Sequence, residues 1–135
     1  MAMVTKQISI FLENKRGRIN DVTKVLAVNG INMEAFCIAE TSDFGLMRLI
    51  VSEVDKAVEV LRAADFAVIV TDVVSISCPN VPGALSSILE RLAEKDIFIE
   101  YMYAFSQHET ADVIIKPNNL DECVRILEGL GQDNR

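Results

Sequence analysis

The chain repeats itself with a period of 66 residues. Gly17 and Gly83 each stand directly before an apolar helix start, and they lie 66 positions apart. The same offset aligns identical pairs in the two halves, namely Ser9-Ile10 with Ser75-Ile76 and Leu26-Ala27 with Leu92-Ala93. An ungapped register that covers strands, helices and glycine corners indicates an internal duplication. The 135-residue chain is therefore expected to fold as two copies of one unit.

Each half has the same alternation of strand-like and helix-like segments. Short β-type runs flank segments whose apolar residues recur at helical spacing. In the first half the predicted order is strand 7–12, a helix from 19 to a stop at Gly30, strands 31–39 and 46–51 around a turn at 41–45, helix 54–61 and strand 66–70. The second half repeats this with a helix at 85–92, strands 97–105 and 110–116 and a helix at 120–127. The order βαββαβ predicts an α+β fold of two tandem ferredoxin-like units, with both helices on one face of an antiparallel sheet.

The domain division follows from the repeat. We predict a first unit in residues 1–70 and a second unit in residues 71–135, without a linker, because 66–78 reads as one strand-like run. Where the second copy needs its fourth strand only the polar segment 129–135 remains, so this strand is short or missing, or is borrowed. A unit of half the chain is marginally stable alone, which predicts an interface shared by the two units.

Composition excludes several classes of function. A net charge of −7 with a single His argues against nucleic-acid or anionic-membrane binding. No run approaches the roughly 20 apolar residues of a membrane span, and the N-terminus lacks the apolar core of a signal peptide. The cysteines Cys37, Cys78 and Cys123 are odd in number and lie in apolar contexts, which predicts buried reduced thiols. We expect a cytoplasmic protein without cofactor or metal.

The sequence offers no set of catalytic residues. His108 is the only imidazole and lies in a predicted hairpin turn, where an exposed loop residue is the expected role. No Cys-x-x-Cys pair is present, and the carboxylates are spread over helix surfaces. An acylphosphatase-like enzyme of the same topology would need an Arg and an Asn, for which Arg16 or Arg18 with Asn32 are candidates, but the second half has neither. We therefore predict that the chain is not an enzyme.

The corner Asn-x-x-Gly occurs twice, as Asn14 to Gly17 and as Asn80 to Gly83. A helix N-terminus leaves backbone N–H groups without intrahelical partners, and its dipole favours an anion. Glycine lets a ligand approach these groups, and the Asn amide both donates and accepts hydrogen bonds. The corner thus suits a carboxylate and an ammonium on one small molecule, that is, an amino acid. The alternative is a purely structural corner, in which Gly permits the tight turn and Asn satisfies local backbone.

Two stretches, ENKRGRINDVTKVLAVNGIN (13–32) and CPNVPGALSSILERLAEKDIFIEYMYAF (78–105), resemble ACT domains, the amino-acid-sensing regulatory modules. The resemblance covers nearly the whole chain and is greatest to free-standing tandem ACT proteins. It implies an amino-acid site at an interface between ACT units. The candidate ligand-binding residues are Asn14, Arg16, Gly17, Arg18 and Asn32 in the first half and Asn80, Val81, Gly83, Ala84 and Leu85 in the second.

The chain also departs from the family's pattern. Arg16 replaces the usual Pro of the corner, and Phe98 replaces the second Asn in the second half. Leu12 and Cys78 stand where serine-binding relatives have His. These departures argue against serine as the ligand, and they favour two non-equivalent sites or a single competent one.

Several strands are apolar on both faces, which bears on assembly. The runs are 31–39, 66–74 and 101–105. In the first of them, Ile31 and Met33 are assigned to one face of the strand and Phe36 and Ile38 to the other. Soluble monomers rarely expose large apolar patches, so we predict a homodimer that covers the sheet face opposite the helices. The leading hypothesis is a non-catalytic amino-acid sensor that signals to a partner enzyme or regulator. The alternatives are a ligand-free docking module, resembling a regulatory subunit of an amino-acid biosynthetic enzyme, and an undetected enzyme.

Overall fold

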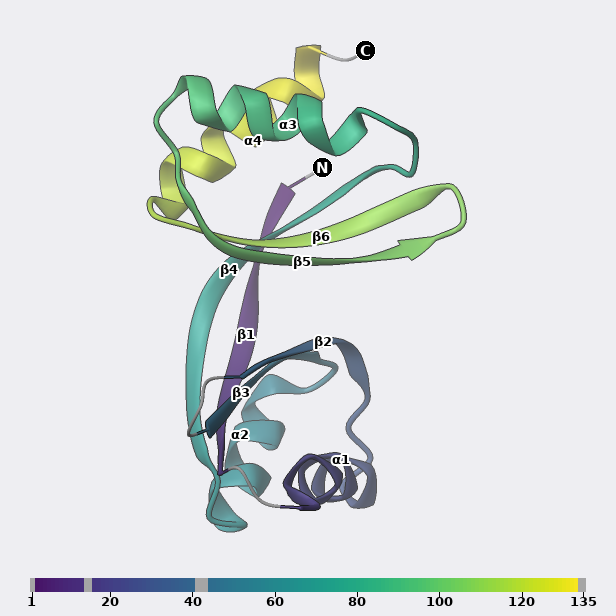
Figure 1. The fold of residues 1–135 in the computed structure, drawn as a ribbon, viewed down its shortest axis with the longest axis vertical. Helices are drawn as coiled ribbons and strands as arrows, with labels where there is room; N and C mark the ends of the chain where they lie inside the picture. The colour runs from purple at the N-terminus through teal and green to yellow at the C-terminus, as the bar shows by residue number, and fades with distance from the viewer. Residues whose placement is uncertain (1, 14–15, 41–43, 134–135) are drawn as a thin grey trace. The chain divides into compact units, whose positions relative to one another are not determined.

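A computed structural model describes residues 2–13, 16–40 and 44–133 (Figure 1). Helices and strands alternate along the chain as the repeat predicts. The elements are β1 (Ala2–Glu13), α1 (Arg18–Val28), β2 (Met33–Glu40), β3 (Phe44–Val51), α2 (Val54–Ala63), β4 (Ala67–Pro79), α3 (Ala84–Glu94), β5 (Ile99–Gln107), β6 (Thr110–Pro117) and α4 (Leu120–Asp133). The α+β class is confirmed, since these helices accompany antiparallel strand pairs.

The duplication is visible in the element boundaries. Helices α1 and α3 begin and end 66 positions apart, and so do strands β3 and β6. The special backbone conformations repeat as well, because Gly17 and Gly83 have φ angles of 84° and 88°. After each of these helices the chain turns through a residue of positive φ, Gly30 at 69° and Asp96 at 58°. The predicted helix stop at Gly30 is therefore confirmed, and its counterpart uses an aspartate.

Strands β1 and β4 are unusually long, and each contributes to two compact units. The hydrogen-bonded strand order is β2-β3-β1-β4-β6-β5. By backbone contacts, residues 6–71 form one unit, called here the first unit. Residues 2–5 and 72–133 form the other, called here the second unit. The predicted continuous strand across 66–78 corresponds to the single strand β4.

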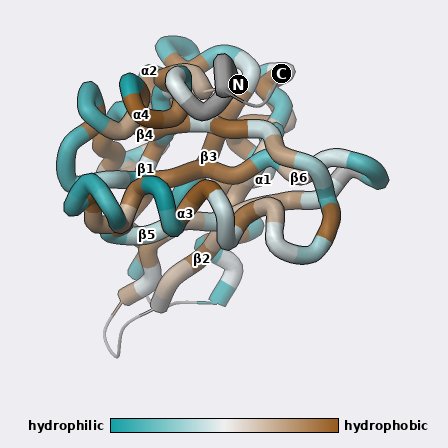
Figure 2. Tube along the Cα trace, turned by 90° about the horizontal axis from the view of Figure 1, so that it is seen from above, coloured by the Kyte–Doolittle hydropathy of each residue, from teal (hydrophilic) through white to brown (hydrophobic). Residues whose placement is uncertain are grey.

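The first unit has one layer of helices over one face of its strands. In β1, Ile8 and Ile10 are fully buried, and they lie opposite Leu49 and Met47 of β3. Helix α1 buries Val22 and Leu26, while α2 buries Ala57 and Leu61. These side chains belong to one hydrophobic cluster, and Figure 2 shows hydrophobic residues along β1 and β3. Fully burying one such aliphatic side chain contributes about 1.5–3 kcal/mol.

The second unit has the same layers, but its extra strand comes from the other end of the chain. Its core includes Val74 and Ile76 of β4, Ile115 of β6, and Leu92 of α3. Ala2, at the start of β1, belongs to the same hydrophobic cluster. Residues 2–5 therefore group with the second unit, whereas the sequence division at residues 70 and 71 placed them in the first. After β6 the chain forms helix α4 as far as Asp133, and no further strand follows among the described residues.

A β-bulge changes the expected facing of β2. The register with β3 shifts between Met33 and Ala35, so that Met33 lies opposite Val51 and Phe36 opposite Leu49. Met33 and Phe36 therefore share the helix-covered side of the sheet, and the expectation that they point to opposite faces is wrong. The bulge adds one residue to β2, which cancels the alternation on which that expectation depended. Strand β5 repeats the bulge between Ile99 and Tyr101.

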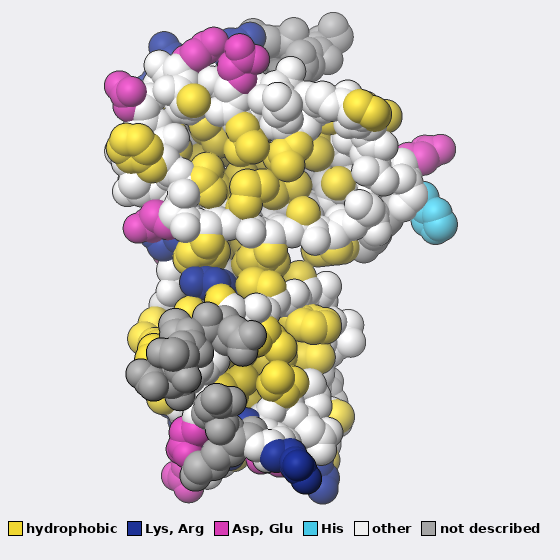
Figure 3. All heavy atoms as spheres, viewed as in Figure 1, with side chains coloured by type: hydrophobic (Ala, Val, Ile, Leu, Met, Phe, Trp, Pro, Cys, Tyr) yellow, Lys and Arg dark blue, Asp and Glu magenta, His cyan; other side chains and the backbone are white. Residues whose placement is uncertain are grey.

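Both units expose apolar side chains. On the face seen in Figure 3, hydrophobic atoms gather on each unit. Phe36 is 55% exposed although it points to the helix side, because β2 is the edge strand of the sheet. None of the described helices combines the length and apolar character that crossing a membrane requires. The three cysteines are free thiols, with Cys78 and Cys123 buried and Cys37 half-buried.

Candidate functional site

The predicted site consists of two glycine corners, and the structure places a helix start directly after each. Helix α1 begins at Arg18 after Gly17, and α3 begins at Ala84 after Gly83. Both glycines adopt the left-handed conformation, which costs other residues free energy. A Cβ at either position would meet no atom of the described residues within 4 Å. The two positions therefore need glycine for its backbone angle and not for lack of space around the Cβ.

The second corner leaves backbone donors available. Gly83 is the N-cap of α3 and has no side chain with which to cap the helix. The Ala84 N–H reaches the Val81 carbonyl at 3.3 Å, and the first intrahelical bond joins the Ser87 N–H to the Gly83 carbonyl at 3.0 Å. The N–H groups of Leu85 and Ser86 make no hydrogen bond to any residue that the structure describes. Such free donors at a helix start favour a bound anion.

Asn80 has a structural role at this corner. Its side-chain Nδ2 donates to the His108 carbonyl at 3.0 Å, and its backbone N–H donates to the Glu109 carbonyl at 2.8 Å. His108 is exposed and has a φ of 58°, as a turn residue of the β5–β6 hairpin. Asn80 therefore connects the corner to this hairpin, 28 residues further along the chain, rather than to local backbone. Its equivalent in the first half, Asn14, lies outside the described residues.

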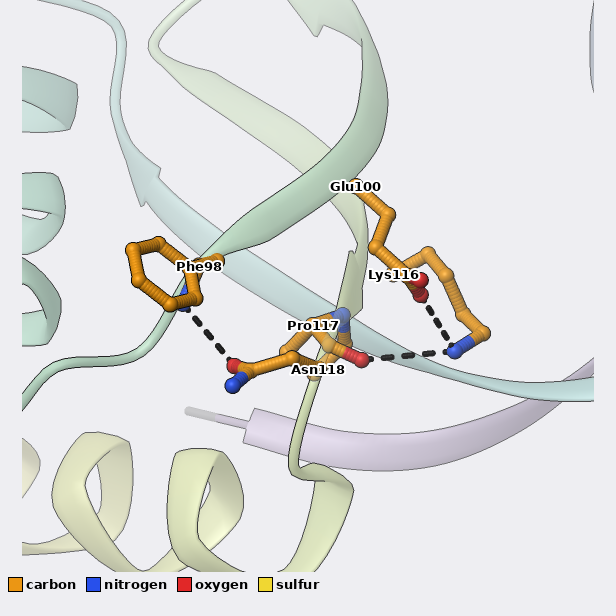
Figure 4. Close-up of polar contacts among 5 residues, drawn as sticks. All are labelled: Phe98, Glu100, Lys116, Pro117 and Asn118. Atoms are coloured by element: carbon orange, nitrogen blue, oxygen red, sulfur yellow. Dashed lines mark hydrogen bonds and ion pairs between the residues drawn. The ribbon is translucent and has the colours of Figure 1, made fainter.

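Asn32 and Phe98 occupy equivalent positions, and both use their backbone in the same way. The Asn32 N–H donates to Ser52 Oγ at 3.0 Å, and the Ser52 N–H returns a bond to the Asn32 carbonyl at 3.0 Å. In the second unit the Phe98 N–H donates to Asn118 Oδ1 at 2.8 Å (Figure 4). The Asn118 N–H in turn donates to the Phe98 carbonyl at 3.0 Å. We call these paired bonds the strand clasps. The Asn32 side chain is exposed and the Phe98 ring is 68% exposed.

The surroundings of the two corners differ in chemistry. The first corner has an exposed Arg16 and a half-buried Arg18 on either side of its glycine. The second has Val81, which is 58% exposed, followed by the half-buried Ala84 and Leu85 of α3. The residues next to the two glycines thus differ, with arginines beside Gly17 and apolar residues beside Gly83.

A hollow of about 380 Å³ lies beside the first corner, and it is lined entirely by residues of the first unit. The residues come from the end of β1, the start of α1, the start of β3 and the segment that leads into β4. They are Phe11, Leu12, Glu13, Arg18, Phe44, Asp65 and Ala67. Only Arg18 was among the predicted site residues. Phe11, Leu12 and Glu13 directly precede the first corner in the sequence. Phe44, Asp65 and Ala67 are distant in sequence and are brought to the hollow by the fold, so no local motif marks them.

Arg18 is held in the hollow mainly by packing. Its guanidinium carbon lies 4.4 Å from the centre of the Phe66 ring, a cation–π distance. Its Nη1 lies 3.5 Å from a carboxylate oxygen of Asp21. Its Nε is buried and has no hydrogen-bond partner among the residues that the structure describes. A buried donor without a partner is unfavourable, so an acceptor entering the hollow would be stabilised there.

The structure offers no candidate metal centre among the residues it describes. In that part of the chain no three His, Cys, Asp or Glu side chains come together in a way that would hold an ion. Among the residues of the acylphosphatase-like alternative, Arg18 contacts Phe66 and Asp21, and the Asn32 residue is exposed.

Comparisons with known proteins agree with the duplicated fold. A family model described as an ACT domain pair matches residues 3–130. The crystal structure of a protein from Bacteroides thetaiotaomicron is 55% identical, with a TM-score of 0.93, and the match covers 96% of this chain and 90% of that chain. No curated protein matches the sequence significantly.

Two more distant structures share the fold. The ligand-free regulatory subunit of aspartate kinase from Thermus thermophilus is 17% identical, with a TM-score of 0.70 and coverage of 95% of both chains. The same subunit from Thermus flavus is 17% identical, with a TM-score of 0.69 and coverage of 99% of this chain and 97% of that one. At this level of identity the likeness shows the fold alone.

Proposed function

The chain belongs to the ACT domain pair family, and we propose that it is a non-catalytic regulatory protein. It binds a small amino acid between ACT units and relays this binding to a partner enzyme or regulator, or to its own assembly state. ACT domains are regulatory modules, and the two distant structures of similar fold are regulatory subunits.

One observation carries the proposal. Two helices begin at left-handed glycines where a Cβ would meet no atom of the described residues within 4 Å, and the N–H groups of Leu85 and Ser86 in α3 have no partner among the described residues. A ligand carboxylate would accept from such donors and would be favoured by the helix dipole. The exposed Asn32 adds an amide that accepts from an ammonium. Asn80 retains its amide oxygen for the same purpose, because its Nδ2 is the atom that bonds His108.

The output follows from linkage between binding and conformation. An amino acid that binds one arrangement of the units more tightly shifts the equilibrium toward it, with a coupling of about 1–3 kcal/mol. The exposed apolar side chains on each unit supply surfaces for a second copy or for a partner protein. We therefore propose that ligand binding alters a homodimer or a complex with the regulated protein.

The second candidate is a docking module without a ligand. A groove of about 450 Å³ lies between α1 and α2, and it is mostly apolar. It is lined by Lys24, Val25, Val28, Asn29, Val60, Ala63 and Ala64. Val28 is 77% exposed there, which favours contact with another protein over a purely internal role.

A screen of all twenty amino acids by thermal shift, followed by calorimetry of each hit, separates the two candidates. A sensor unfolds at a higher temperature with its ligand, because a ligand that binds only the folded state stabilises it. Shifts of zero throughout the screen would contradict sensing and favour the docking module.

Substitutions at the corners then show which corner binds. Gly17→Asn and Gly83→Asn each add a side chain in front of the helix start, and Asn tolerates positive φ better than most residues. We expect the ligand-induced shift to disappear in the variant whose corner binds. A shift that both variants retain would place the ligand elsewhere. Circular dichroism provides the control for folding.

A further inference from the structure

The hollow beside the first corner is large enough for one amino acid. Its volume of about 380 Å³ lies at the lower end of the range of small-molecule sites, about 300–1,000 Å³. It carries three kinds of group: the guanidinium of Arg18, the carboxylates of Glu13 and Asp65, and the rings of Phe11 and Phe44.

The cation in the hollow favours a carboxylate. The only ion-pair partner of Arg18 among the described residues is Asp21, at 3.5 Å, and its buried Nε is left without an acceptor. The planar guanidinium presents several donors that match the two oxygens of a carboxylate. Packing on Phe66 holds the group in place before any ligand arrives.

The two carboxylates restrict the ligand further. Glu13 and Asp65 line the same hollow, so a simple anion at Arg18 would be repelled by both. An ammonium on the same molecule turns this repulsion into attraction. The balance of charges in the hollow therefore favours a zwitterion over an anion.

The aromatic rings of the hollow indicate the polarity and size of the ligand's side chain. Phe11 and Phe44 are 40% and 43% exposed, and their ring centres are 6.2 Å apart at a tilt of 56°. An apolar side chain that covers them removes this aromatic surface from water, whereas a small polar side chain does not. The rings thus favour a large apolar side chain.

The duplication shows that these groups are not required by the corner fold. The second half has Ser77 where the first has Phe11, Ala84 where it has Arg18, and Thr110 where it has Phe44. Helix α3 and strand β6 nevertheless form as α1 and β3 do. The equivalent corner of the second half therefore forms without this charge and these rings.

We propose that the hollow of the first unit binds an amino acid with a large apolar side chain. Arg18 holds the carboxylate, Asp65 with Glu13 faces the ammonium, and Phe11 with Phe44 contacts the side chain. This inference rests on the proposed function and changes two parts of it: the amino acid has a large apolar side chain, and the residues that select it belong to the first unit.

Calorimetry on the full chain tests the ligand class. The probes are phenylalanine, leucine, glycine and serine, with 3-phenylpropionate as the analogue that lacks the ammonium and 2-phenylethylamine as the one that lacks the carboxylate. We expect phenylalanine and leucine to bind more tightly than glycine and serine, and both analogues to bind more weakly than phenylalanine. A preference for glycine or serine would overturn the inference, as would undiminished binding of 2-phenylethylamine.

Substitutions test the site. Phe11→Ser, Arg18→Ala and Phe44→Thr each introduce the residue type found at the equivalent position of the second half. Those positions are Ser77, Ala84 and Thr110. Arg91→Ala, which removes an exposed arginine from α3 in the second unit, is the matched control. We expect Arg18→Ala to weaken phenylalanine binding by about tenfold or more, the strength of a charged hydrogen bond. The ring substitutions should weaken phenylalanine more than glycine, and Arg91→Ala should bind like the wild type.

The outcomes separate this inference from the proposed function. If the wild type binds amino acids and the substituted chains bind them equally well, the hollow is not the site, while sensing stands. If none of the twenty amino acids binds the wild type, sensing itself fails and the hollow's role fails with it. The ring substitutions keep the test valid if Arg18→Ala disturbs the packing on Phe66.

Discussion

At the scale of single residues, glycine conformation decides where helices α1 and α3 can begin. Gly17 and Gly83 hold φ angles of 84° and 88° in open surroundings. Steric crowding by neighbours is thus not the reason for glycine at these positions, and the backbone angle is. Asp96 shows that an aspartate is accommodated at a φ of 58° in the turn after α3, where the first unit has Gly30.

Alanine substitutions should change the free energy of unfolding in opposite directions at a left-handed glycine and at a glycine inside a helix. Gly17→Ala forces a side chain into the left-handed region and is expected to destabilise the fold by about 1–2 kcal/mol. Gly129→Ala, within α4, is expected to stabilise by about 0.5–1 kcal/mol, since glycine weakens a helix and the added Cβ meets no atom within 4 Å. Urea unfolding measures both. Equal effects of the two substitutions would contradict the role given to Gly17.

The three cysteines differ in burial, and we expect this to make them differ in reactivity. Burial raises the pKa of the Cys123 thiol, whereas Cys37 is only half-buried. A raised pKa means that the neutral thiol is favoured in the fold, so its contribution to stability is complete below the pKa of the unfolded thiol. That contribution is lost as pH rises through the higher pKa of the folded state.

Alkylation at about pH 8 should therefore modify Cys37 first, because Cys37 is the only one of the three cysteines that is not buried. Cys78 and Cys123 should react only as the chain unfolds, because both are buried. Mass spectrometry of the peptides reads out the order. In guanidinium all three should react alike, and a native Cys123 that reacts as fast as Cys37 would contradict its burial.

At the scale of elements, the strand clasps show how the duplicated design tolerates different side chains. Ser52 Oγ and Asn118 Oδ1 occupy equivalent positions, and each accepts a hydrogen bond from the residue that precedes an edge strand. Both clasps lie beside the repeated bulges of β2 and β5. The position needs an acceptor, and the residue type that supplies it is free to vary.

Asn118→Ala should therefore destabilise the second unit by about 0.5–1.5 kcal/mol, the net value of one hydrogen bond. Asn118→Ser should restore part of the loss, since Ser52 performs this role in the first unit. Asn20→Ala on the exposed surface of α1 is the control, and it should be neutral or slightly stabilising. Thermal unfolding measures each, and an Asn118→Ala variant as stable as the wild type would refute the role.

At the scale of the whole molecule, strands β1 and β4 each contain residues of both units. Strand β1 runs through residues 2–5, which group with the second unit, and then into the first unit. Strand β4 runs in the opposite sense, from the first unit into the second. Residues 2–5 thereby place a strand segment in the second unit, in which no strand follows α4 among the described residues.

Deletion of residues 1–5 should therefore destabilise residues 72–133 more than residues 6–71, although the deleted segment directly precedes residue 6 in the sequence. We expect faster hydrogen exchange in β6 and in residues 72–79 of β4, with smaller changes in β3. Met3→Ser provides the control, because Met3 is 63% exposed and Ala2 is the buried residue of this segment. A deletion that loosens β3 instead would contradict the grouping.

The exposed apolar residues lead to an expectation about assembly. Phe36, Phe98 and Val28 are more than half exposed, which soluble monomers avoid when such residues gather. We expect a homodimer by light scattering at micromolar concentration. Phe36→Ser should weaken a dimer that buries β2, and a monomeric mass for the wild type would count against the assembly.

The sequence by itself determined the repeat, the type and order of the elements, and the two glycine corners. These features depend on local periodicity and on backbone conformation, which neighbouring residues in the chain decide. The helix stop at Gly30 and the run that became β4 were readable for this reason. The family resemblance rested on the same local motifs, and the match over residues 3–130 confirms it.

The tertiary structure alone decided which distant residues meet. The grouping of residues 2–5 with the second unit, the hollow that joins Arg18 to Phe44 and Asp65, and the Asn80–His108 bond all join segments far apart in the chain. The bulge in β2 also escaped sequence reasoning, because one added residue reverses the facing of all that follow it. Contacts of this kind depend on strand order and register, which the packing of the whole chain selects.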